Sequence, residues 1–430
     1  MKIGIIGSGH VGLVTGACFA HLGHQVICMD SDPRKIAMLK KGISPIYEPG
    51  LTELVRANLK EKRLTFTLDL KRTVKDAEVL FVCVGTPPKE SGEANLVAVE
   101  NVAAEIAQAM TSYRIVVDKS TVPVQTGEWV QKTIAKNRKR NVAFDVASNP
   151  EFLREGSAVQ DFLEPDRVVL GVESKRAAKI LKELYSPLKA PILITDIKSA
   201  ELIKHASNSF LAAKISFINL ISQVCEAVGA DVKKVAEGMG LDKRIRPNFL
   251  NAGVGFGGFC FPKDLSAFIR ISEKLGVDPG LLREVLRVND SQKKFFVHKV
   301  EQQLWNLTGK NVGVLGLSFK ADTDDMRFAP SIEIINDLLK EGVKIQAYDP
   351  EAVANAKEIF GNRIVYAKNA YEAVRGTDAL VVLTEWSEFL KLDFKRIKKL
   401  MRHHVIFDGR NLYEREKMKK LGFQYFGVGR

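Results

Sequence analysis

The sequence is poor in the residues that build disulfide frameworks and metal centres. It has five Cys among 430 residues, and no two of them form a CxxC pair. An odd number of scattered Cys argues against structural disulfides and zinc sites and favours a reducing compartment, so we expect a cytoplasmic protein. The seven His include no HExxH sequence. We therefore predict no metal site.

Long hydrophobic runs are also scarce. No stretch is expected to provide the roughly 20 apolar residues that span a bilayer, so we predict no membrane association. Residues 1–8 read as a strand that leads into glycines, which differs from a signal peptide. With 46% hydrophobic and 27% charged residues, the composition is that of an ordinary globular protein.

The net charge of +13 narrows the choice of ligand. Lys and Arg are spread along segments such as 132–140 and 391–402, without the clustering and interleaved aromatics of a nucleic-acid surface, so no nucleic-acid partner is predicted. The positive charge is better explained as attracting a phosphorylated, anionic ligand. The length exceeds what one hydrophobic core supports and indicates two or three domains.

The N-terminus carries a dinucleotide fingerprint. An apolar strand is followed by Gly7-Ser8-Gly9-His10-Val11-Gly12, a helix, and a second strand over Gln25–Met29 that ends at Asp30. Backbone amides of such a glycine turn and the helix N-terminus bind pyrophosphate, which assigns Gly7, Gly9, Val11 and Gly12 to the cofactor. Asp30 would accept hydrogen bonds from ribose hydroxyls, which favours NAD over NADP. The alternative is a tight strand–helix turn without a ligand.

Further apolar strands are predicted over 79–84, 115–119 and 142–148. Each ends in a polar or turn-forming segment, at 85–88, 120–123 and 149–151 respectively. In a doubly wound sheet the carboxyl ends of the strands line the ligand crevice. We therefore expect all three segments to face the cofactor or the substrate.

The C-terminal part repeats this pattern in outline. A strand is predicted over Asn311–Leu315 before Gly316, and another over Val343–Tyr348 before Asp349. A full GxGxxG is missing, so this part is expected to bind a different nucleotide ligand. Mostly helical patterns lie between the two halves. We predict domains at 1–198, 199–299 and 300–430: two Rossmann-like doubly wound α/β domains joined by a helical middle domain.

A long central helix is predicted over 199–229. Its apolar residues lie on more than one side, which suits a connector that also forms a dimer. Lys204 and Asn208 stand four apart and so share one face of this helix. They are interpreted as a cation and an amide that hold a developing oxyanion in a cleft between domains. The alternative is a polar surface stripe.

The segment Gly257-Gly258-Phe259-Cys260-Phe261-Pro262-Lys263-Asp264 is the most informative in the chain. It places a thiol beside a cation and a carboxylate within a glycine-rich turn. Oxidation of an alcohol by itself needs no nucleophile, so a thiol implies that an aldehyde is captured and oxidised again. The alternative is a small buried hydrophobic residue, which is the expectation for Cys18, Cys28 and Cys83.

Two further charged groups are candidates. Glu151 and Glu155 stand four apart; a carboxylate near a thioester activates water, although the pair could equally interact with a helix N-terminus. Arg327, with Lys320 seven residues before it, follows the first strand of the C-terminal half. Its guanidinium suits a phosphate or a carboxylate, although the nearby Asp residues could simply pair with it.

Taken in order, these motifs resemble the UDP-glucose/GDP-mannose 6-dehydrogenase family, and most of all its UDP-glucose 6-dehydrogenase branch, over essentially the full length. The resemblance implies that NAD is contacted by Asp30, Lys35, Thr86, Thr121, Glu155, Lys263 and Arg327. It implies that the UDP-sugar is held by Glu151, Phe152, Leu153, Lys204, Asn208, Phe249, Leu250, Asn251, Gly253, Gly257 and Lys320. Arg244 resembles an arginine that dimers of this family lend to the neighbouring subunit's site.

The activity implied by the resemblance is a four-electron oxidation of the C6 alcohol of UDP-glucose to UDP-glucuronate. Cys260 would form a thiohemiacetal and then a thioester. Lys204 and Asn208 would stabilise oxyanions, Asp264 with Thr121 and a water would assist proton transfer, and Glu151 would assist at the thioester.

Three alternatives stay open. The same chemistry could act on GDP-mannose or a UDP-N-acetylhexosamine. A two-electron β-hydroxyacid dehydrogenase would need neither Cys260 nor a second α/β domain. A non-catalytic sensor of NAD and nucleotide sugar would gain nothing from the thiol.

One residue departs from the family pattern. A small residue, commonly Ser, usually precedes the cysteine, and here it is Phe259. Its ring could narrow the sugar pocket or face the opposite side of the turn.

Overall fold

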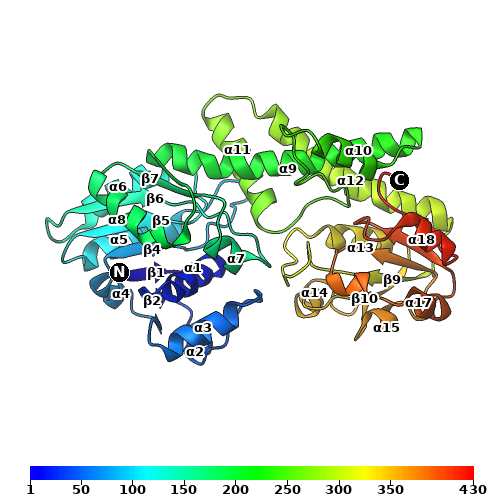
Figure 1. The fold of residues 1–430 in the computed structure, drawn as a ribbon, viewed down its shortest axis with the longest axis horizontal. Coiled ribbons are helices and arrows are strands. Elements are labelled where there is room, and N and C mark those ends of the chain that lie inside the picture. The colour runs from blue at the N-terminus through cyan, green and yellow to red at the C-terminus, as the bar shows by residue number, and fades with distance from the viewer. The chain divides into compact units, whose positions relative to one another are not determined.

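The computed structural model describes residues 1–430. The chain forms two compact units. Unit 1 comprises Met1–Ser207 with Ser266–Gly276, and unit 2 comprises Asn208–Leu265 with Val277–Arg430. Each unit is built on one predominantly parallel sheet (Figure 1). This confirms the predicted α/β fold class. The division at 1–198, 199–299 and 300–430 stays a prediction.

Unit 1 contains an eight-stranded sheet in the order β3-β2-β1-β4-β5-β6-β7-β8. All neighbours pair in parallel except β6 and β7, which are antiparallel. Its strands are β1 Lys2–Ile6, β2 Gln25–Met29, β3 Leu64–Thr67, β4 Val79–Val82, β5 Arg114–Asp118, β6 Phe144–Ser148, β7 Val168–Val172 and β8 Ile192–Thr195. Its helices are α1 His10–His21, α2 Pro33–Lys40, α3 Leu51–Lys60, α4 Leu70–Asp76, α5 Val97–Ala109, α6 Thr126–Asn137, α7 Ala158–Leu163 and α8 Lys175–Tyr185, followed by a short 3-10 turn, Ser186–Leu188.

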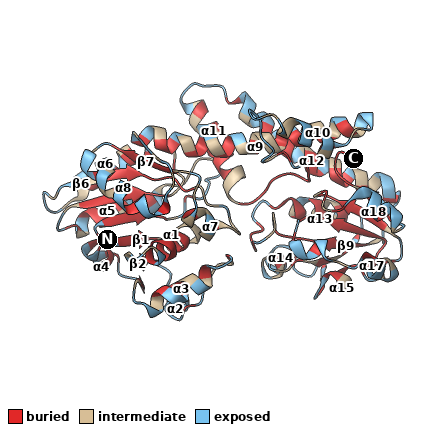
Figure 2. Cartoon of the chain, in the orientation of Figure 1, coloured by how far each residue is buried: buried red, intermediate tan, exposed pale blue.

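Both faces of this sheet are buried (Figure 2). Ile3 and Ile5 of β1 pack into one cluster with Phe19 of α1, whereas Ile6 packs into a second cluster with Ile106 of α5. Successive side chains of a strand point to opposite faces, so an apolar run such as β1 feeds both clusters. This sandwich fixes the carboxyl ends of β1, β2, β4, β5 and β6 along one edge.

Unit 2 contains a six-stranded parallel sheet in the order β11-β10-β9-β12-β13-β14. Its strands are β9 Asn311–Leu315, β10 Lys344–Tyr348, β11 Val365–Tyr366, β12 Ala379–Val382, β13 Val405–Asp408 and β14 Gln424–Phe426. Its sheet-covering helices are α13 Pro330–Lys340, α14 Val353–Phe360, α15 Ala370–Ala373, α16 Ser387–Leu390, α17 Phe394–Leu400 and α18 Arg415–Lys420. The predicted repeat of the N-terminal pattern is confirmed, because β9 and β10 take the places that β1 and β2 take in unit 1.

The segment between the sheets is helical, as predicted. It comprises α9 Ile197–Val228, α10 Val232–Gly240, α11 Cys260–Lys274 and α12 Gly280–Leu304. The chain between α10 and α11 is irregular and contains Phe249, Leu250, Asn251, Gly253 and Gly257, which are among the residues expected to contact the sugar. Both α9 and α11 are continuous helices whose first and last turns belong to different units.

By length and composition alone, α9 is apolar enough to cross a membrane. The expectation that no run reaches this length is therefore wrong for α9. Such a single helix is weak evidence, because long core helices pass the same test. Its polar residues Lys204, Asn208 and Asn219 are buried, whereas Phe210 is 68% exposed.

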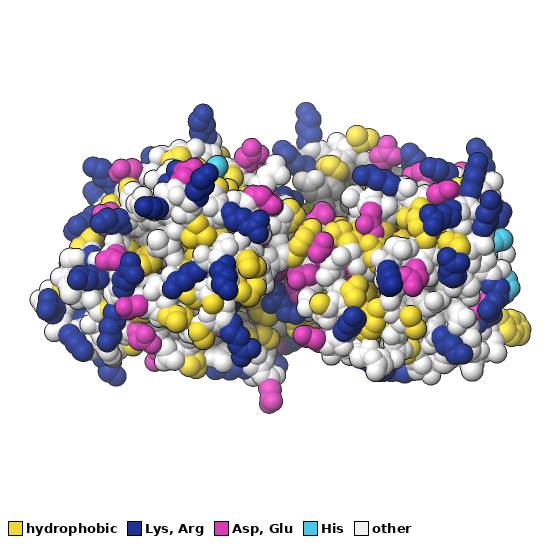
Figure 3. All heavy atoms as spheres, turned by 90° about the horizontal axis from the view of Figure 1, so that it is seen from below, with side chains coloured by type: hydrophobic (Ala, Val, Ile, Leu, Met, Phe, Trp, Pro, Cys, Tyr) yellow, Lys and Arg dark blue, Asp and Glu magenta, His cyan; other side chains and the backbone are white.

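Charge is dispersed over the surface. On the face in Figure 3, Lys and Arg side chains are scattered with Asp and Glu between them, and no single basic stripe stands out. This distribution matches the interpretation of the basic segments as solvated helix faces.

Candidate active site

The dinucleotide fingerprint forms a glycine turn between β1 and α1. Gly7 has φ +96°, and a Cβ at Gly12 would lie 1.9 Å from the Gly7 carbonyl oxygen, so larger residues are excluded there. At Gly9, in contrast, a Cβ would meet no atom within 4 Å. The backbone at the start of α1 is thus open to a ligand. These residues fit the pyrophosphate of a dinucleotide.

Asp30 follows β2 and its carboxylate is held in place by three donors. It accepts hydrogen bonds from the Ser8 amide (2.8 Å), the Asp32 amide (3.0 Å) and Lys35 Nζ (3.0 Å). Burial by itself would raise the pKa of Asp30, but these hydrogen bonds outweigh it and lower the pKa. The group is an anion poised at the end of β2, where a ribose would lie.

The ends of β4 and β5 meet in one hydrogen bond. The Thr86 hydroxyl donates to the Thr121 carbonyl oxygen at 2.9 Å, and Thr86 is buried. The segments after β4 and β5 are thereby brought together at the carboxyl edge of the sheet, as the sequence predicts.

Lys204 and Glu151 form a buried ion pair. Lys204 Nζ lies 2.9 Å from Glu151 Oε1, and each side chain is 5% exposed. The other carboxylate oxygen of Glu151 accepts from the Leu153 amide at 2.7 Å. Phe152 lies against the cation, with Lys204 Nζ 5.5 Å from its ring centroid. The alternative that Lys204 and Asn208 form a surface stripe is wrong, because both are buried.

A second buried cation, Lys119, was not singled out by the sequence. It directly follows β5, and its Nζ donates to Asn149 Oδ1 at 2.9 Å. Tyr185 donates to the same oxygen. Burial lowers the pKa of Lys119 to about 8, with Glu151 acting in the opposite direction. A Lys at the end of a buried strand is the signal that would have identified it.

His10, inside the fingerprint, was also missed. Its Nε2 lies 3.0 Å from Glu48 Oε2. The Glu48 carboxylate also accepts from the amides of Gly156 (2.9 Å) and Ala158 (2.8 Å), which open α7. Glu48 therefore binds the amides at the N-terminus of α7. The alternative that Glu151 and Glu155 interact with a helix N-terminus stays open.

Cys260 is the first residue of α11 and is half-buried. The preceding Gly258 has φ +76°, which turns the chain into the helix. All five cysteines are free thiols, and the other four are buried. The expectation that Cys18, Cys28 and Cys83 are buried hydrophobic residues is confirmed; burial raises the pKa of Cys18 and of Cys83 to about 12.

Asp264 lies one turn beyond Cys260 and joins two predicted residues. One carboxylate oxygen accepts from Asn208 Nδ2 and the other from Lys263 Nζ, both at 2.6 Å. All three side chains are buried. Asn208 and Lys204 lie one turn apart on α9.

The loop before Cys260 is held by polar contacts within unit 2. The Gly253 amide donates to Asn219 Oδ1 at 2.9 Å, and Leu250 is buried. Phe249 has φ +65°, whereas Asn251 is exposed. Arg410 donates to the carbonyl oxygens of Gly255 (3.2 Å), Leu383 (2.8 Å) and Phe319 (2.9 Å). Arg244 is 88% exposed and pairs with Asp242.

The end of β9 mirrors the fingerprint turn without a full glycine motif. Gly316 has φ +91°, and the Asp349 carboxylate accepts from the amides of Leu317 (2.7 Å) and Ser318 (3.1 Å). Lys320 follows and is half-buried. Arg327 donates from Nε and Nη2 to the two Asp325 oxygens at 2.8 and 2.7 Å. The predicted alternative of an Asp partner is therefore realised, with half of the Arg327 side chain still exposed.

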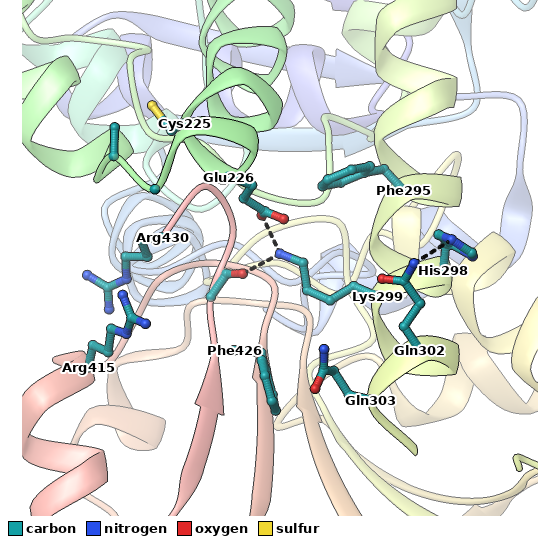
Figure 4. Close-up of a pocket in the computed structure, with 13 residues that line it drawn as sticks. Cys225, Glu226, Phe295, His298, Lys299, Gln302, Gln303, Arg415, Phe426 and Arg430 are labelled. Carbon is teal, nitrogen blue, oxygen red and sulfur yellow. Dashed lines mark hydrogen bonds and ion pairs between the residues drawn. The ribbon is translucent and has the colours of Figure 1, made fainter. Parts of the chain in front are cut away.

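A pocket of about 370 Å³ lies elsewhere in unit 2, between the ends of α9 and α12 and the C-terminal strand (Figure 4). None of the predicted site residues lines it. Lys299 is bound there by Glu226 and the Gly427 carbonyl oxygen, and Arg430 by Tyr413 and Tyr425. Lys299 and Arg430 in this pocket are therefore already bound by other groups of the protein. No group of three or more His, Cys, Asp or Glu residues is arranged to hold a metal ion.

Comparison with known proteins matches three domains of one family along the chain. The NAD binding domain of the UDP-glucose/GDP-mannose dehydrogenase family matches residues 1–189, its central domain residues 198–291, and its UDP binding domain residues 313–415. The chain is 46% identical over 429 residues to UDP-glucose 6-dehydrogenase TuaD of Bacillus subtilis (strain 168), covering 100% of this chain and 93% of that protein.

Solved structures agree. A UDP-glucose dehydrogenase from Pyrobaculum islandicum superposes with a TM-score of 0.93 at 39% identity, covering 100% of this chain and 97% of the other. A UDP-D-ManNAc dehydrogenase from Pyrococcus horikoshii gives a TM-score of 0.87 at 26% identity, covering 100% and 99%.

Proposed function

The chain belongs to the UDP-glucose/GDP-mannose dehydrogenase family, and we propose that it oxidises the C6 alcohol of UDP-glucose to the carboxylate of UDP-glucuronate with NAD. The observation that carries the four-electron proposal is the placement of Cys260. It alone of the five cysteines is not buried, and it opens a helix in which Lys263 lies in the same turn and Asp264 one turn beyond. Helix N-termini and adjacent cations favour a nucleophilic sulfur.

The dinucleotide fingerprint lies in unit 1. The glycine turn of residues 7–12 would bind the pyrophosphate and Asp30 a ribose, while the remaining cofactor contacts are proposed for Lys35, Thr86, Thr121, Glu155, Lys263 and Arg327. When bound, NAD accepts the hydride that leaves C6 in each oxidation. The residues of this chain orient the reacting carbon and manage charge and protons around it.

The covalent steps centre on Cys260. The Cys260 sulfur would add to the C6 aldehyde that the first oxidation produces, giving a thiohemiacetal. The second oxidation would convert this thiohemiacetal to a thioester. Water would then attack the thioester carbon, releasing the carboxylate and restoring the thiol. Lys204 and Asn208 would stabilise the oxyanions, and Asp264, with Thr121 and a water, would carry the protons. Glu151, already paired with Lys204, would assist the hydrolysis.

The sugar would be held by Glu151, Phe152, Leu153, Lys204, Asn208, Phe249, Leu250, Asn251, Gly253, Gly257 and Lys320. UDP-glucose is favoured over a UDP-N-acetylhexosamine by similarity, because the relative named for UDP-glucose is 46% identical and the one named for UDP-D-ManNAc is 26% identical. GDP-mannose is a further candidate within the family. A sensor without catalysis would have no use for the half-buried thiol of Cys260.

A homodimer through α9 is the assembly that we propose. The exposed residues Phe210, Phe217, Leu220, Val224 and Val228 recur at helical spacing, while the polar Ser216, Asn219 and Ser222 are buried. An apolar face of this kind needs a cover, and a second copy with Arg244 reaching its partner's site provides one. In such a dimer the apolar face of α9 is covered by protein, so no membrane is needed to bury it. The free thiols are consistent with a reducing cytoplasm.

The direct test counts NADH. Purified protein is supplied with limiting UDP-glucose, GDP-mannose or UDP-N-acetylhexosamines and excess NAD, and NADH is followed by absorbance. Two NADH per UDP-glucose, with UDP-glucuronate as the product, are expected. One NADH per sugar would indicate a simple alcohol dehydrogenase, and none with any sugar would indicate a sensor; either outcome contradicts the proposal.

A further inference from the structure

Phe259 packs against two cations, Lys263 and Arg327. Arg327 Cζ lies 4.3 Å from the centroid of its ring, and Lys263 Nζ lies 5.5 Å from it. Both distances are within the range in which an aromatic ring attracts a cation. The ring is half-buried, so this attraction is only partly screened by water.

The backbone explains how these groups meet. A Cβ at Gly257 would lie 2.3 Å from the Phe328 carbonyl oxygen, and one at Gly258 would lie 2.7 Å from the Phe319 ring. The glycines therefore let the turn pack directly on the segment 319–330. Phe259 then comes to lie beside Arg327, whose guanidinium is held from another direction by Asp325.

Each cation thus has a carboxylate and an aromatic partner. Lys263 donates to Asp264 at 2.6 Å, and Arg327 donates to Asp325. A carboxylate fixes one end of a long side chain, and the ring restricts its remaining freedom. If the two flexible cations are ordered before a ligand arrives, less side-chain conformational entropy is lost on binding.

We propose that Phe259 is a positioning residue for the cofactor: its ring preorganises Lys263 and Arg327 and so sets the affinity for NAD, without lining the sugar site. The inference rests on the proposed function, in which both cations contact NAD. It decides between the two orientations that the sequence left open for this ring.

The test compares Phe259→Leu, which keeps apolar bulk but removes the aromatic face, with Phe259→Tyr, which keeps the face. A cation–π contact at a partly exposed site corresponds to about a two- to fivefold change in affinity. With two cations involved, we expect Phe259→Leu to raise KM for NAD about three- to tenfold while KM for UDP-glucose stays within about twofold. Phe259→Tyr should resemble the wild type in both constants.

A double-mutant cycle with Arg327→Met tests whether the Phe259 ring acts through Arg327. If the ring acts through Arg327, the effects of Phe259→Leu and Arg327→Met on KM for NAD are less than additive. The Tm of each variant, measured by thermal unfolding, shows whether a substitution has destabilised the fold by loss of packing. Three outcomes overturn the inference: an unchanged KM for NAD in Phe259→Leu, a change confined to KM for UDP-glucose, or equal defects in Leu and Tyr variants that follow a lowered Tm. Failure of the proposed function is distinguishable, because the wild type would then oxidise no UDP-glucose with NAD.

Discussion

Lys204 and Glu151 face each other in a nearly dry environment, with Nζ and Oε1 2.9 Å apart and each side chain 5% exposed. Two desolvated charges are tolerated because they are paired, and removing one leaves the other uncompensated. The pair therefore links stability and chemistry. The proposed oxyanion contact of Lys204 and the proposed hydrolytic role of Glu151 draw on the same ion pair.

Substitution of this pair separates the two roles. Lys204→Met should abolish turnover and lower the free energy of unfolding by about 3 kcal/mol, because the Glu151 carboxylate is left buried without this partner. The double variant Lys204→Met/Glu151→Leu should regain most of that stability, since a buried pair replaced by apolar groups is often neutral, but remain inactive. Urea unfolding and steady-state kinetics measure the two quantities. Recovery of activity together with stability would contradict the catalytic assignment.

Asp30 should make the protein prefer NAD to NADP. Its carboxylate is held toward the ribose position by the Ser8 amide and Lys35, so a 2′-phosphate would meet an anion. The ratio of kcat/KM for NAD over NADP should exceed about tenfold, or 1.4 kcal/mol. Asp30→Ser should reduce the ratio, because Lys35 is then released to a phosphate. Asp30→Ser/Lys35→Ala is the matched control. It should lose the improved use of NADP that Asp30→Ser gains from the released Lys35. Equal use of both cofactors by the wild type would show that Asp30 has another role.

His10 should make stability depend on pH. Burial by itself would lower its pKa, but Glu48, Glu155 and Glu151 together raise the pKa above 6.5. A raised folded-state pKa stabilises the fold fully below pH 6.5, and this contribution disappears as the pH rises through the folded-state value. The difference in Tm between wild type and His10→Gln should therefore shrink from pH 5.5 to pH 8.5, about one unit below and two above the ordinary His value. A difference that stays constant across this range would exclude the linkage.

Arg244 should act in the partner's site. Arg244 is exposed, and its guanidinium pairs with Asp242, two residues away. Co-refolding Arg244→Ala with Cys260→Ala should give heterodimers that contain one site with both groups intact. We expect about a quarter to a half of wild-type activity per heterodimer, whereas each homodimer is inactive or nearly so. Isolated heterodimers without activity would rule out the role across the interface.

The strands were predictable because parallel strands buried on both faces are continuous apolar runs. Gln25–Met29 and Asn311–Leu315 coincide with β2 and β9. Asp30 follows β2 and Asp349 follows β10, as expected. The start of α11 at Cys260 is consistent with Pro262, because proline is typical of a first helical turn.

The remaining features depend on contacts that are remote in sequence. The approach of Glu48 to His10 and Gly156, the burial of Lys119, and the stacking of Arg327 on Phe259 arise only when the loops between strands fold together. For α9, the sequence predicted a long helix with apolar residues on more than one side, but not which side is covered. A sequence window reports composition, while the fold decides which face of a helix is covered.

The covalent role of Cys260 is the central claim, and the C6 aldehyde of UDP-glucose tests it most directly. Given this aldehyde and NAD, the wild type should produce one NADH and one UDP-glucuronate per aldehyde, because only the second oxidation remains. Cys260→Ala should bind the aldehyde but produce neither, since it lacks the sulfur that forms the oxidisable adduct. Cys260→Ser should accumulate an ester that hydrolyses slowly. Conversion of the aldehyde to UDP-glucuronate by Cys260→Ala at the wild-type rate would contradict covalent catalysis and leave Cys260 as a packing residue.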